Sequence, residues 1–229
     1  MKVFNSYVKP EAKITLDTHP SRIVTLGYDA YDTLRALGVE NLVIAAPKHR
    51  IPEYISSMPD SVVDTKSLTN IDLEQIRLLK PDLIIASART SFLLDDLEKI
   101  APVFNYDTYS SDYWSNFDDI NLELARIVNK EAEARHLLLD LNSRADRIRV
   151  ASKQSPSKTL LLLHNENSFT TFKPNSRFAL FFTLLDFTPV ERDFSFTELA
   201  ESIKVSEIAT LDADRVFIIN RSAAMRYDP

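Results

Sequence analysis

The stretch IDLEQIRLLKPDLIIASAR, residues 71–89, decides the fold of this chain. Its first part is expected to be a helix that ends before Pro81, because proline disfavours helical backbone in the residue that precedes it. The short apolar run after Pro81 is typical of a strand buried on both faces of a parallel sheet. A helix followed by a buried strand is the repeating unit of an α/β fold.

The same alternation continues on both sides of this stretch. Upstream, residues 22–26 are expected to form a strand, Gly27 to permit the tight turn after it, and residues 29–37 to form a helix with Gly38 as its C-cap. Downstream, residues 91–107, SFLLDDLEKIAPVFNYD, repeat helix and then strand. The alternation predicts a parallel sheet built from βα units.

The run from residue 118 to about residue 154 has a different pattern, because it contains no proline or glycine and helix formers dominate it. Its apolar stripes predict two helices that break near Asn129–Lys130, the second of them long enough to join two lobes. We therefore predict an N-terminal α/β lobe over 1–128, an inter-lobe helix over 129–154 and a C-terminal α/β lobe over 155–229.

Two further segments extend the pattern. Residues 1–16 are typical of a small β-hairpin or edge region. A second βα series follows the long helix: a strand in TLLLLHNENS (159–168), a helix in RFALFFTLLDF (177–187), and helix then strand in VSEIATLDADRVFIINR (205–221). The predicted fold is α/β, with a parallel-type sheet flanked by helices in each lobe.

Composition excludes several classes of function. The 229 residues carry a net charge of -6, which argues against a general nucleic-acid binder. The absence of cysteine excludes thiol catalysis and zinc–thiolate sites, and the two glycines exclude a glycine-rich phosphate loop. None of the four histidines forms a close pair and no catalytic motif is present, so we expect neither a bare metal site nor an enzyme.

Targeting signals are also missing from the sequence. No segment reaches the roughly 18 consecutive apolar residues that a membrane span needs. The first 16 residues lack the apolar core of a signal peptide, so the leader of an exported protein would be absent from this chain.

Three arginines are the strongest candidates for binding a ligand. Arg89 and Arg221 each follow a short apolar run, and Arg177 opens the predicted helix PNSRFALFFTLL. Ligands of open α/β sheets bind beyond the carboxyl ends of strands, and an arginine is costly to bury there without an anion. Three such cations indicate a multiply charged anionic ligand. For each arginine alone, an ion pair with a nearby acidic residue is the alternative.

Six segments carry a family resemblance: residues 20–39, 46–55, 71–89, 97–104, 173–185 and 206–223. Together they resemble the siderophore-binding proteins of bacterial ABC iron importers, over nearly the whole chain. The resemblance is strongest to the subgroup that binds ferric catecholates, and it implies two lobes joined by one long helix, with the ligand in an inter-lobe cleft. It implies a carrier located outside the cytoplasmic membrane, in the periplasm or on a lipid anchor that this chain does not contain.

The resemblance also assigns residues. In that subgroup three cleft arginines hold the ferric complex, at positions that correspond to Arg89, Arg177 and Arg221. The ferric siderophore is then the ligand, and no intrinsic cofactor is expected. The remaining residues expected to line the cleft are Tyr28, Lys48 and Tyr106.

One surface glutamate in each lobe docks these proteins on their membrane permease. The matching position in the first lobe is Glu74. In the second lobe it is Ser206, whose neighbour Glu207 is the candidate. The alternative for both glutamates is an ordinary exposed carboxylate on a helix.

The sequence departs from the family in three respects. The position of an iron-ligating histidine in some relatives holds Leu199, and their iron-ligating tyrosine would fall beyond Pro229. Glycines usual in the turns of the family are replaced, and the C-terminal lobe is expected to be shortened. Two alternatives follow: a haem- or corrinoid-binding protein of the same fold, or a degenerate or regulatory interaction module.

Overall fold

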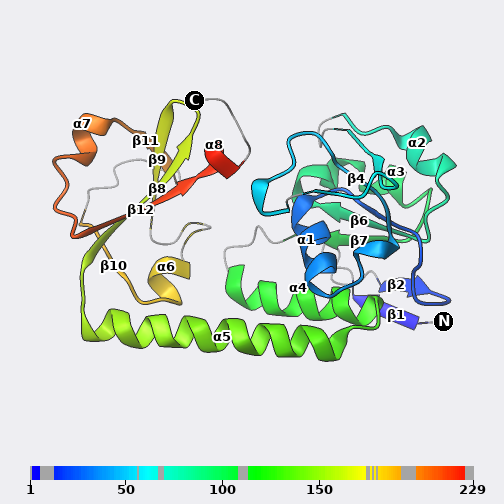
Figure 1. Ribbon diagram of the computed structural model, residues 1–229, viewed down its shortest axis with the longest axis horizontal. Coiled ribbons are helices and arrows are strands. Elements are labelled where there is room, and N and C mark those ends of the chain that lie inside the picture. Colours follow the sequence, from blue (N-terminus) through cyan, green and yellow to red (C-terminus); the bar gives the residue numbers. More distant parts are fainter. Residues whose placement is uncertain are drawn as a thin grey trace. The chain divides into compact units, whose positions relative to one another are not determined.

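The computed structural model describes residues 2–5, 13–55, 57–66, 70–107, 113–173, 176, 178, 180–191 and 200–224. The chain divides into two compact units within its longest helix (Figure 1). Unit 1 comprises Met1–Tyr109 and Ser115–Leu137, and unit 2 comprises Ser110–Trp114 and Leu138–Pro229.

Unit 1 is built on a parallel sheet of five strands. They are β3 (Ile23–Thr25), β4 (Val43–Ala46), β5 (Val63–Asp64), β6 (Leu83–Ser87) and β7 (Val103–Tyr106). Their spatial order is β5-β4-β3-β6-β7, with every neighbouring pair parallel. The predicted parallel sheet is confirmed here. The strand order reverses between β3 and β6, which makes their carboxyl ends the topological switch point of the sheet.

Helices cover both faces of this sheet. On one face, Ile85 of β6 packs in a core that is covered by α1 (Tyr28–Ala36) and α4 (Tyr113–Ile127). On the other face, its neighbour Ile84 packs in a core that is covered by α2 (Leu73–Leu78) and α3 (Leu94–Leu97). Burial on both faces explains the continuous apolar run of β6. Three short 3₁₀ helices complete the unit: η1 (Glu40–Leu42), η2 (Glu53–Ile55) and η3 (Ala88–Leu93).

The N-terminal strands β1 (Lys2–Asn5) and β2 (Lys13–Leu16) form an antiparallel pair, as predicted for the first 16 residues. Gly38 also has its predicted role, because it follows α1 with a φ of 70°, a left-handed conformation that suits glycine.

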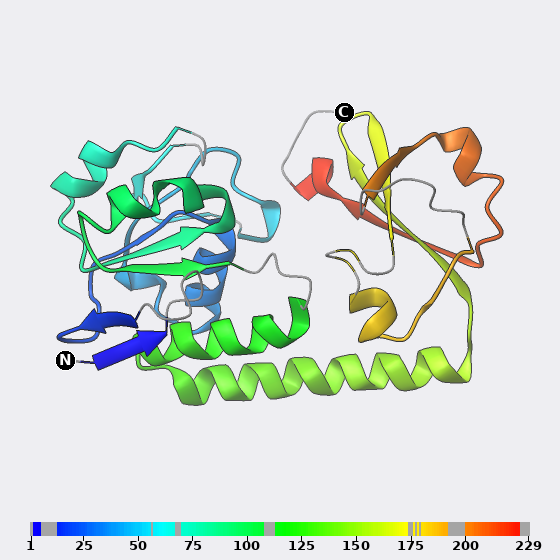
Figure 2. The ribbon, with the colours of Figure 1, turned by 180° about the vertical axis from the view of Figure 1, so that it is seen from behind.

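The predicted break between the two long helices is confirmed. Helix α4 ends at Ile127 and α5 (Glu131–Gln154) begins four residues later, with the turn at Asn129 in the left-handed region at φ 58°. Asparagine tolerates this conformation better than most residues. The two helices then run side by side (Figures 1 and 2), and α5 contributes residues to both units.

Unit 2 contains a mixed sheet of β8 (Lys158–Asn165), β9 (Ser168–Phe172), β10 (Thr188–Pro189), β11 (Ala200–Ile203) and β12 (Arg215–Asn220). Strand β8 pairs in parallel with β12 (Figure 2), as the sequence predicts, and also in parallel with β10, which the sequence did not predict. It also pairs antiparallel with β9, which pairs antiparallel with β11. Neither antiparallel pair was predicted. The β8–β9 pair arises because a turn at Glu166, with φ 55°, returns the chain alongside β8.

Three short helices accompany this sheet: α6 (Leu180–Thr183), α7 (Val205–Ile208) and α8 (Arg221–Ala224). Leu160, Leu162, Val190 and Ile203 form its buried core. In contrast, β12 exposes apolar side chains, with Val216 46% and Ile218 53% accessible.

Candidate ligand-binding site

The carboxyl ends of β3 and β6 meet at the switch point of unit 1. The two strands pair in parallel up to Thr25 and Ile85, and the Ser87 hydroxyl donates a hydrogen bond to the Leu26 carbonyl at 3.0 Å. Arg89 follows β6 at this edge, as its sequence position predicts. Ligands of open α/β sheets bind in the crevice at such a switch point. The edge is therefore the candidate ligand-binding site of unit 1.

The start of η3 holds Arg89 on a fixed backbone. The Ser87 backbone N–H donates to the Thr90 hydroxyl oxygen at 2.9 Å, and that hydroxyl donates to the Ser87 carbonyl at 3.1 Å. Thr90 is fully buried, whereas Arg89 is exposed. Within the part of the chain that the structure describes, the Arg89 guanidinium makes no hydrogen bond or ion pair. The alternative of a structural ion pair is thus not observed for this arginine.

Asp29 is a second charged residue at this edge, and sequence reasoning missed it. Its Oδ1 accepts a hydrogen bond from the Ala30 N–H at 2.9 Å. Burial raises the pKa of Asp29, and the charge of Asp107 raises it further, while Arg89 opposes both effects. The available signal was its position, since Asp29 follows β3 as Arg89 follows β6.

Gly27 permits the close approach of these groups. A Cβ atom at position 27 would lie 2.4 Å from Oδ1 of Asp29 and 3.2 Å from Cβ of Ser87. Real side chains do not adopt such a separation, so any other residue would displace the Asp29 carboxylate. The glycine predicted for the turn after β3 therefore leaves room for the Asp29 carboxylate in its observed position.

Tyr28 and Lys48 lie beyond neighbouring strands of the same sheet, β3 and β4. The Tyr28 hydroxyl donates to the carbonyl of His49, and burial, with smaller contributions from Asp64 and Tyr54, raises the pKa of Tyr28 to about 12. Lys48 Nζ donates to the Pro59 carbonyl at 2.9 Å. Both side chains have backbone partners, and their predicted contact with a ligand stays a prediction.

Tyr106 requires a correction. The sequence placed it on the lining of a cleft, but its side chain is only 2% exposed. Its hydroxyl donates to Asn121 Oδ1 at 2.9 Å and lies 3.0 Å from the Thr33 hydroxyl, so it joins α4 and α1 inside the core. Alternation along β7 turns this residue toward the two helices rather than toward solvent.

Arg221 occupies the corresponding position in unit 2. It begins α8 directly after β12, whose parallel neighbour β8 ends at the same edge. Its Nη1 donates to Oδ1 of Asn165, and the side chain is half-buried. This partner is a neutral amide, and the contact orients the guanidinium at the end of β12. Arg177 lies outside the described residues.

Both predicted docking glutamates are exposed. Glu74 lies in the first turn of α2, with Oε1 at 3.4 Å from Nε of Arg77. Glu207 lies in α7, where its carboxylate accepts a hydrogen bond from the Lys204 N–H at 2.8 Å, and its neighbour Ser206 is exposed as well. Their docking role stays a prediction.

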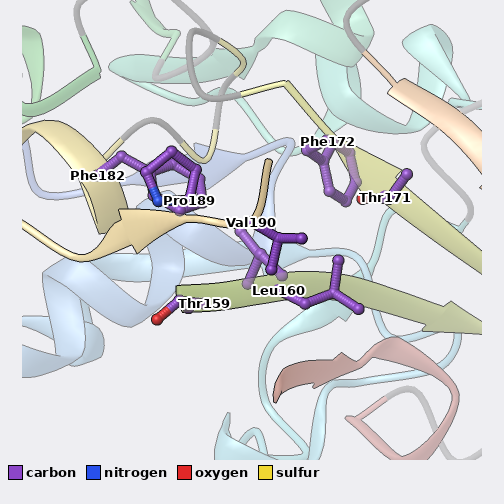
Figure 3. Close-up of a pocket in the computed structure, with 8 residues that line it drawn as sticks. Thr159, Leu160, Thr171, Phe172, Phe182, Pro189 and Val190 are labelled. Atoms are coloured by element: carbon purple, nitrogen blue, oxygen red, sulfur yellow. The ribbon is translucent and has the colours of Figure 1, made fainter. Parts of the chain in front are cut away.

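A small cavity lies inside unit 2 (Figure 3). Its volume of about 10 Å³ corresponds to roughly one water molecule, which is too small for an organic ligand. It is lined by Thr159, Leu160, Leu161, Thr171, Phe172, Phe182, Pro189 and Val190.

The described residues contain neither a metal-binding cluster nor a membrane-spanning helix. No three histidine or acidic side chains gather there in an arrangement that could hold a metal ion. None of the helices described is both long enough and apolar enough to cross a membrane.

Each α/β unit carries an arginine just beyond the carboxyl end of a strand, the edge at which open α/β sheets bind ligands. The chain belongs to the periplasmic binding protein family, whose profile matches residues 23–228. It is similar to the petrobactin-binding protein YclQ of Bacillus subtilis, with 26% identity over 208 residues, 90% of this chain and 66% of that protein. It is also similar to the ferric-anguibactin-binding protein FatB of Vibrio anguillarum, with 24% identity over 93% of this chain and 68% of that protein.

Among solved structures, the chain is similar to the iron uptake ABC transporter substrate-binding protein PiuA of Streptococcus pneumoniae. The TM-score is 0.89 and the sequence identity 28%, over 100% of this chain and 80% of that one. The chain thus spans about two thirds of the length of the curated relatives and four fifths of the solved structure.

Proposed function

We propose that this protein is a carrier that captures an anionic ferric siderophore, of the catecholate type, and delivers it to an ABC permease. The observation that carries the proposal is the exposed guanidinium of Arg89 at the switch point of unit 1, fixed by the backbone of η3 and without an acidic hydrogen-bond partner among the described residues. Two of the relatives are named for binding petrobactin and ferric anguibactin, which supports a siderophore as the ligand.

The charges of the site suit such a ligand. A ferric tris-catecholate complex is a bulky trianion, and guanidinium groups provide permanent charge, directional donors and a flat surface for stacking. Arg89 from unit 1 and Arg221 from unit 2, with Arg177 as the third, would supply this charge in a chain whose net charge is -6. Capture requires no proton transfer or covalent step, so we propose a binding protein and not an enzyme.

Fluorescence titration tests the binding step, because a coloured ferric complex quenches the emission of the single tryptophan, Trp114. Wild-type protein should bind a ferric tris-catecholate saturably. Replacement of Arg89 or Arg221 by glutamine should each weaken binding roughly 10-fold or more, the effect of losing one charge-assisted hydrogen bond. Arg144→Gln, an exposed arginine on α5, is the matched control and should leave affinity unchanged.

Two results would refute the binding proposal. One is the absence of saturable binding to any ferric siderophore. The other is an unchanged affinity in the double variant Arg89→Gln, Arg221→Gln. Haem and a corrinoid, titrated in parallel, are the ligands that the alternative of the same fold predicts.

Delivery to a permease is the second part of the proposal. We propose that Glu74 and Glu207 contact the permease, which places the protein outside the cytoplasmic membrane. In cells that take up the ferric siderophore through this protein, Glu74→Lys with Glu207→Lys should abolish uptake and leave ligand affinity unchanged. Replacement of the exposed Glu53 by lysine is the control. Normal uptake by the double variant would contradict the assignment.

A further inference from the structure

The side chains of η3 fall on distinct faces. A 3₁₀ helix has three residues per turn, so side chains three positions apart lie above one another. Thr90 and Leu93 are one such pair: Thr90 is buried and Leu93 packs against the core of unit 1. Arg89 and Phe92 are the other pair, and both are exposed. The helix therefore presents a guanidinium and a phenyl ring together, on one face directed away from the core.

Arg89 and Phe92 together indicate the kind of ligand more specifically than either residue alone. Phe92 is 70% exposed, and a single exposed aromatic residue on a surface requires no explanation. Here, however, the ring shares its face with the arginine at the switch point of the sheet, where α/β proteins bind ligands. A cation next to an exposed ring suits a ligand that is both anionic and aromatic.

We propose that Phe92 is a ligand-binding residue that selects ferric complexes with aromatic donor groups. Its ring packs against an aromatic ring of the ligand, while Arg89 binds the negative charge of the iron-chelating oxygens. The inference rests on the proposed function and deepens it, since it names a residue that would select siderophores with aromatic donor groups. A ferric complex without aromatic rings satisfies Arg89 but leaves Phe92 in water.

The backbone holds the two side chains in register before a ligand arrives. The hydrogen bonds between Ser87 and Thr90 fix the first turn of η3. The last turn continues directly into α3, whose Leu97 is fully buried. Since both ends of η3 are anchored, the spacing between Arg89 and Phe92 is preorganised, and binding pays little for ordering this segment.

The test is a titration with two probes, a ferric tris-catecholate and ferric citrate, which has no aromatic ring. Phe92→Leu should weaken binding of the catecholate roughly 5- to 20-fold, the contribution expected of one aromatic contact and its buried surface. The same variant should change the affinity for ferric citrate less than about twofold, and Phe92→Tyr should restore catecholate binding. Because the side chain is exposed, the melting temperature of both variants should match the wild type.

Leu78→Ala is the matched control. Leu78 is also exposed, at 79%, but lies at the end of α2 that leads into β6, opposite the candidate site. This variant should bind both probes like the wild type.

The outcomes separate the inference from the proposed function. If wild-type protein binds the catecholate and Phe92→Leu binds it equally well, Phe92 does not contact the ligand and the inference is overturned, while the proposed function stands. Equal losses for both probes would overturn the aromatic selectivity. If wild-type protein binds neither probe nor any other ferric siderophore, the proposed function itself fails.

Discussion

Asp29 and Arg89 lie at the switch point of unit 1, one after β3 and the other after β6, and the charge of the arginine lowers the pKa that burial raises at the aspartate. The pair contributes a cation and a carboxylate to one edge of the sheet. An anionic ligand would be attracted by Arg89 and repelled by the ionised carboxylate of Asp29. Asp29 therefore limits how strongly Arg89 attracts such a ligand.

Asp29→Asn should stabilise the protein at neutral pH. The raised folded-state pKa means that the folded protein disfavours the ionised carboxylate, so ionised Asp29 opposes folding at pH values above this raised pKa. Asparagine can accept the same hydrogen bond from the Ala30 N–H and removes the charge. The gain in unfolding free energy should shrink as the pH falls through the raised pKa and vanish below about 3.9, the ordinary value for aspartate. Urea denaturation over a pH series measures it.

Asp72→Asn is a control at an aspartate whose pKa is shifted in the opposite direction. The backbone N–H of Gln75 lowers the pKa of Asp72, so its carboxylate stabilises the fold above the unfolded-state pKa, and that stability is lost at lower pH. The control should therefore be less stable than wild type at neutral pH. A pH-independent difference for Asp29→Asn would contradict the assigned cause. Asp29→Asn should also bind an anionic siderophore more tightly than the wild type.

Thr90→Val should destabilise unit 1. The substitution conserves shape but removes the hydroxyl that bonds to the Ser87 N–H and carbonyl, which leaves a buried donor unpaired. We expect a loss of about 1–3 kcal/mol in unfolding free energy. Thr25→Val is the matched control, because Thr25 is equally buried and its hydroxyl has no partner among the described residues. That variant should be neutral or more stable, and equal effects of the two would exclude a role for the hydrogen bonds.

Tyr106→Phe should affect stability and not ligand binding. It removes the hydroxyl that donates to Asn121, at an expected cost of about 0.5–1.5 kcal/mol. Asn121 Oδ1 keeps the hydrogen bond from the Thr33 hydroxyl, so the loss should stay moderate. Thermal or chemical denaturation gives the first quantity and siderophore titration the second. Weaker binding with unchanged stability would restore Tyr106 to the list of ligand contacts.

Substitution of two neighbouring residues of β12, Phe217 and Ile218, should change the stability of the protein by different amounts. Phe217 contacts Phe181 and Phe187, with ring centroids 5.5 and 5.2 Å apart, so Phe217→Ala should cost about 1–3 kcal/mol. Ile218 is 53% exposed, against 36% for Phe217, so Ile218→Lys should change stability by less than about 0.5 kcal/mol. The lysine should raise the concentration at which the protein aggregates, because it interrupts an exposed apolar strand. Light scattering against concentration measures this, and unchanged aggregation would show that β12 is not the surface responsible.

Local sequence was sufficient for the elements whose signals lie within a few residues. The apolar run of β6, the helix stop at Pro81, the turn at Gly38 and the break near Asn129 all depend on neighbouring side chains and on backbone preference. The arginines after β6 and β12 were also found this way, because the strand that precedes each one is recognisable by itself.

Tertiary structure decided what depends on pairing between distant segments. Strand β9 was missed because its partners β8 and β11 determine it, and a weakly polar segment alone does not distinguish a strand from a loop. Tyr106 follows a strand as a ligand contact would, yet the packing of α1 and α4 buries it. Asp29 and Arg89, 60 positions apart in sequence, share one edge only because β3 pairs with β6. Sequence determines the local periodicity, whereas strand order and side-chain direction follow from which surfaces bury one another.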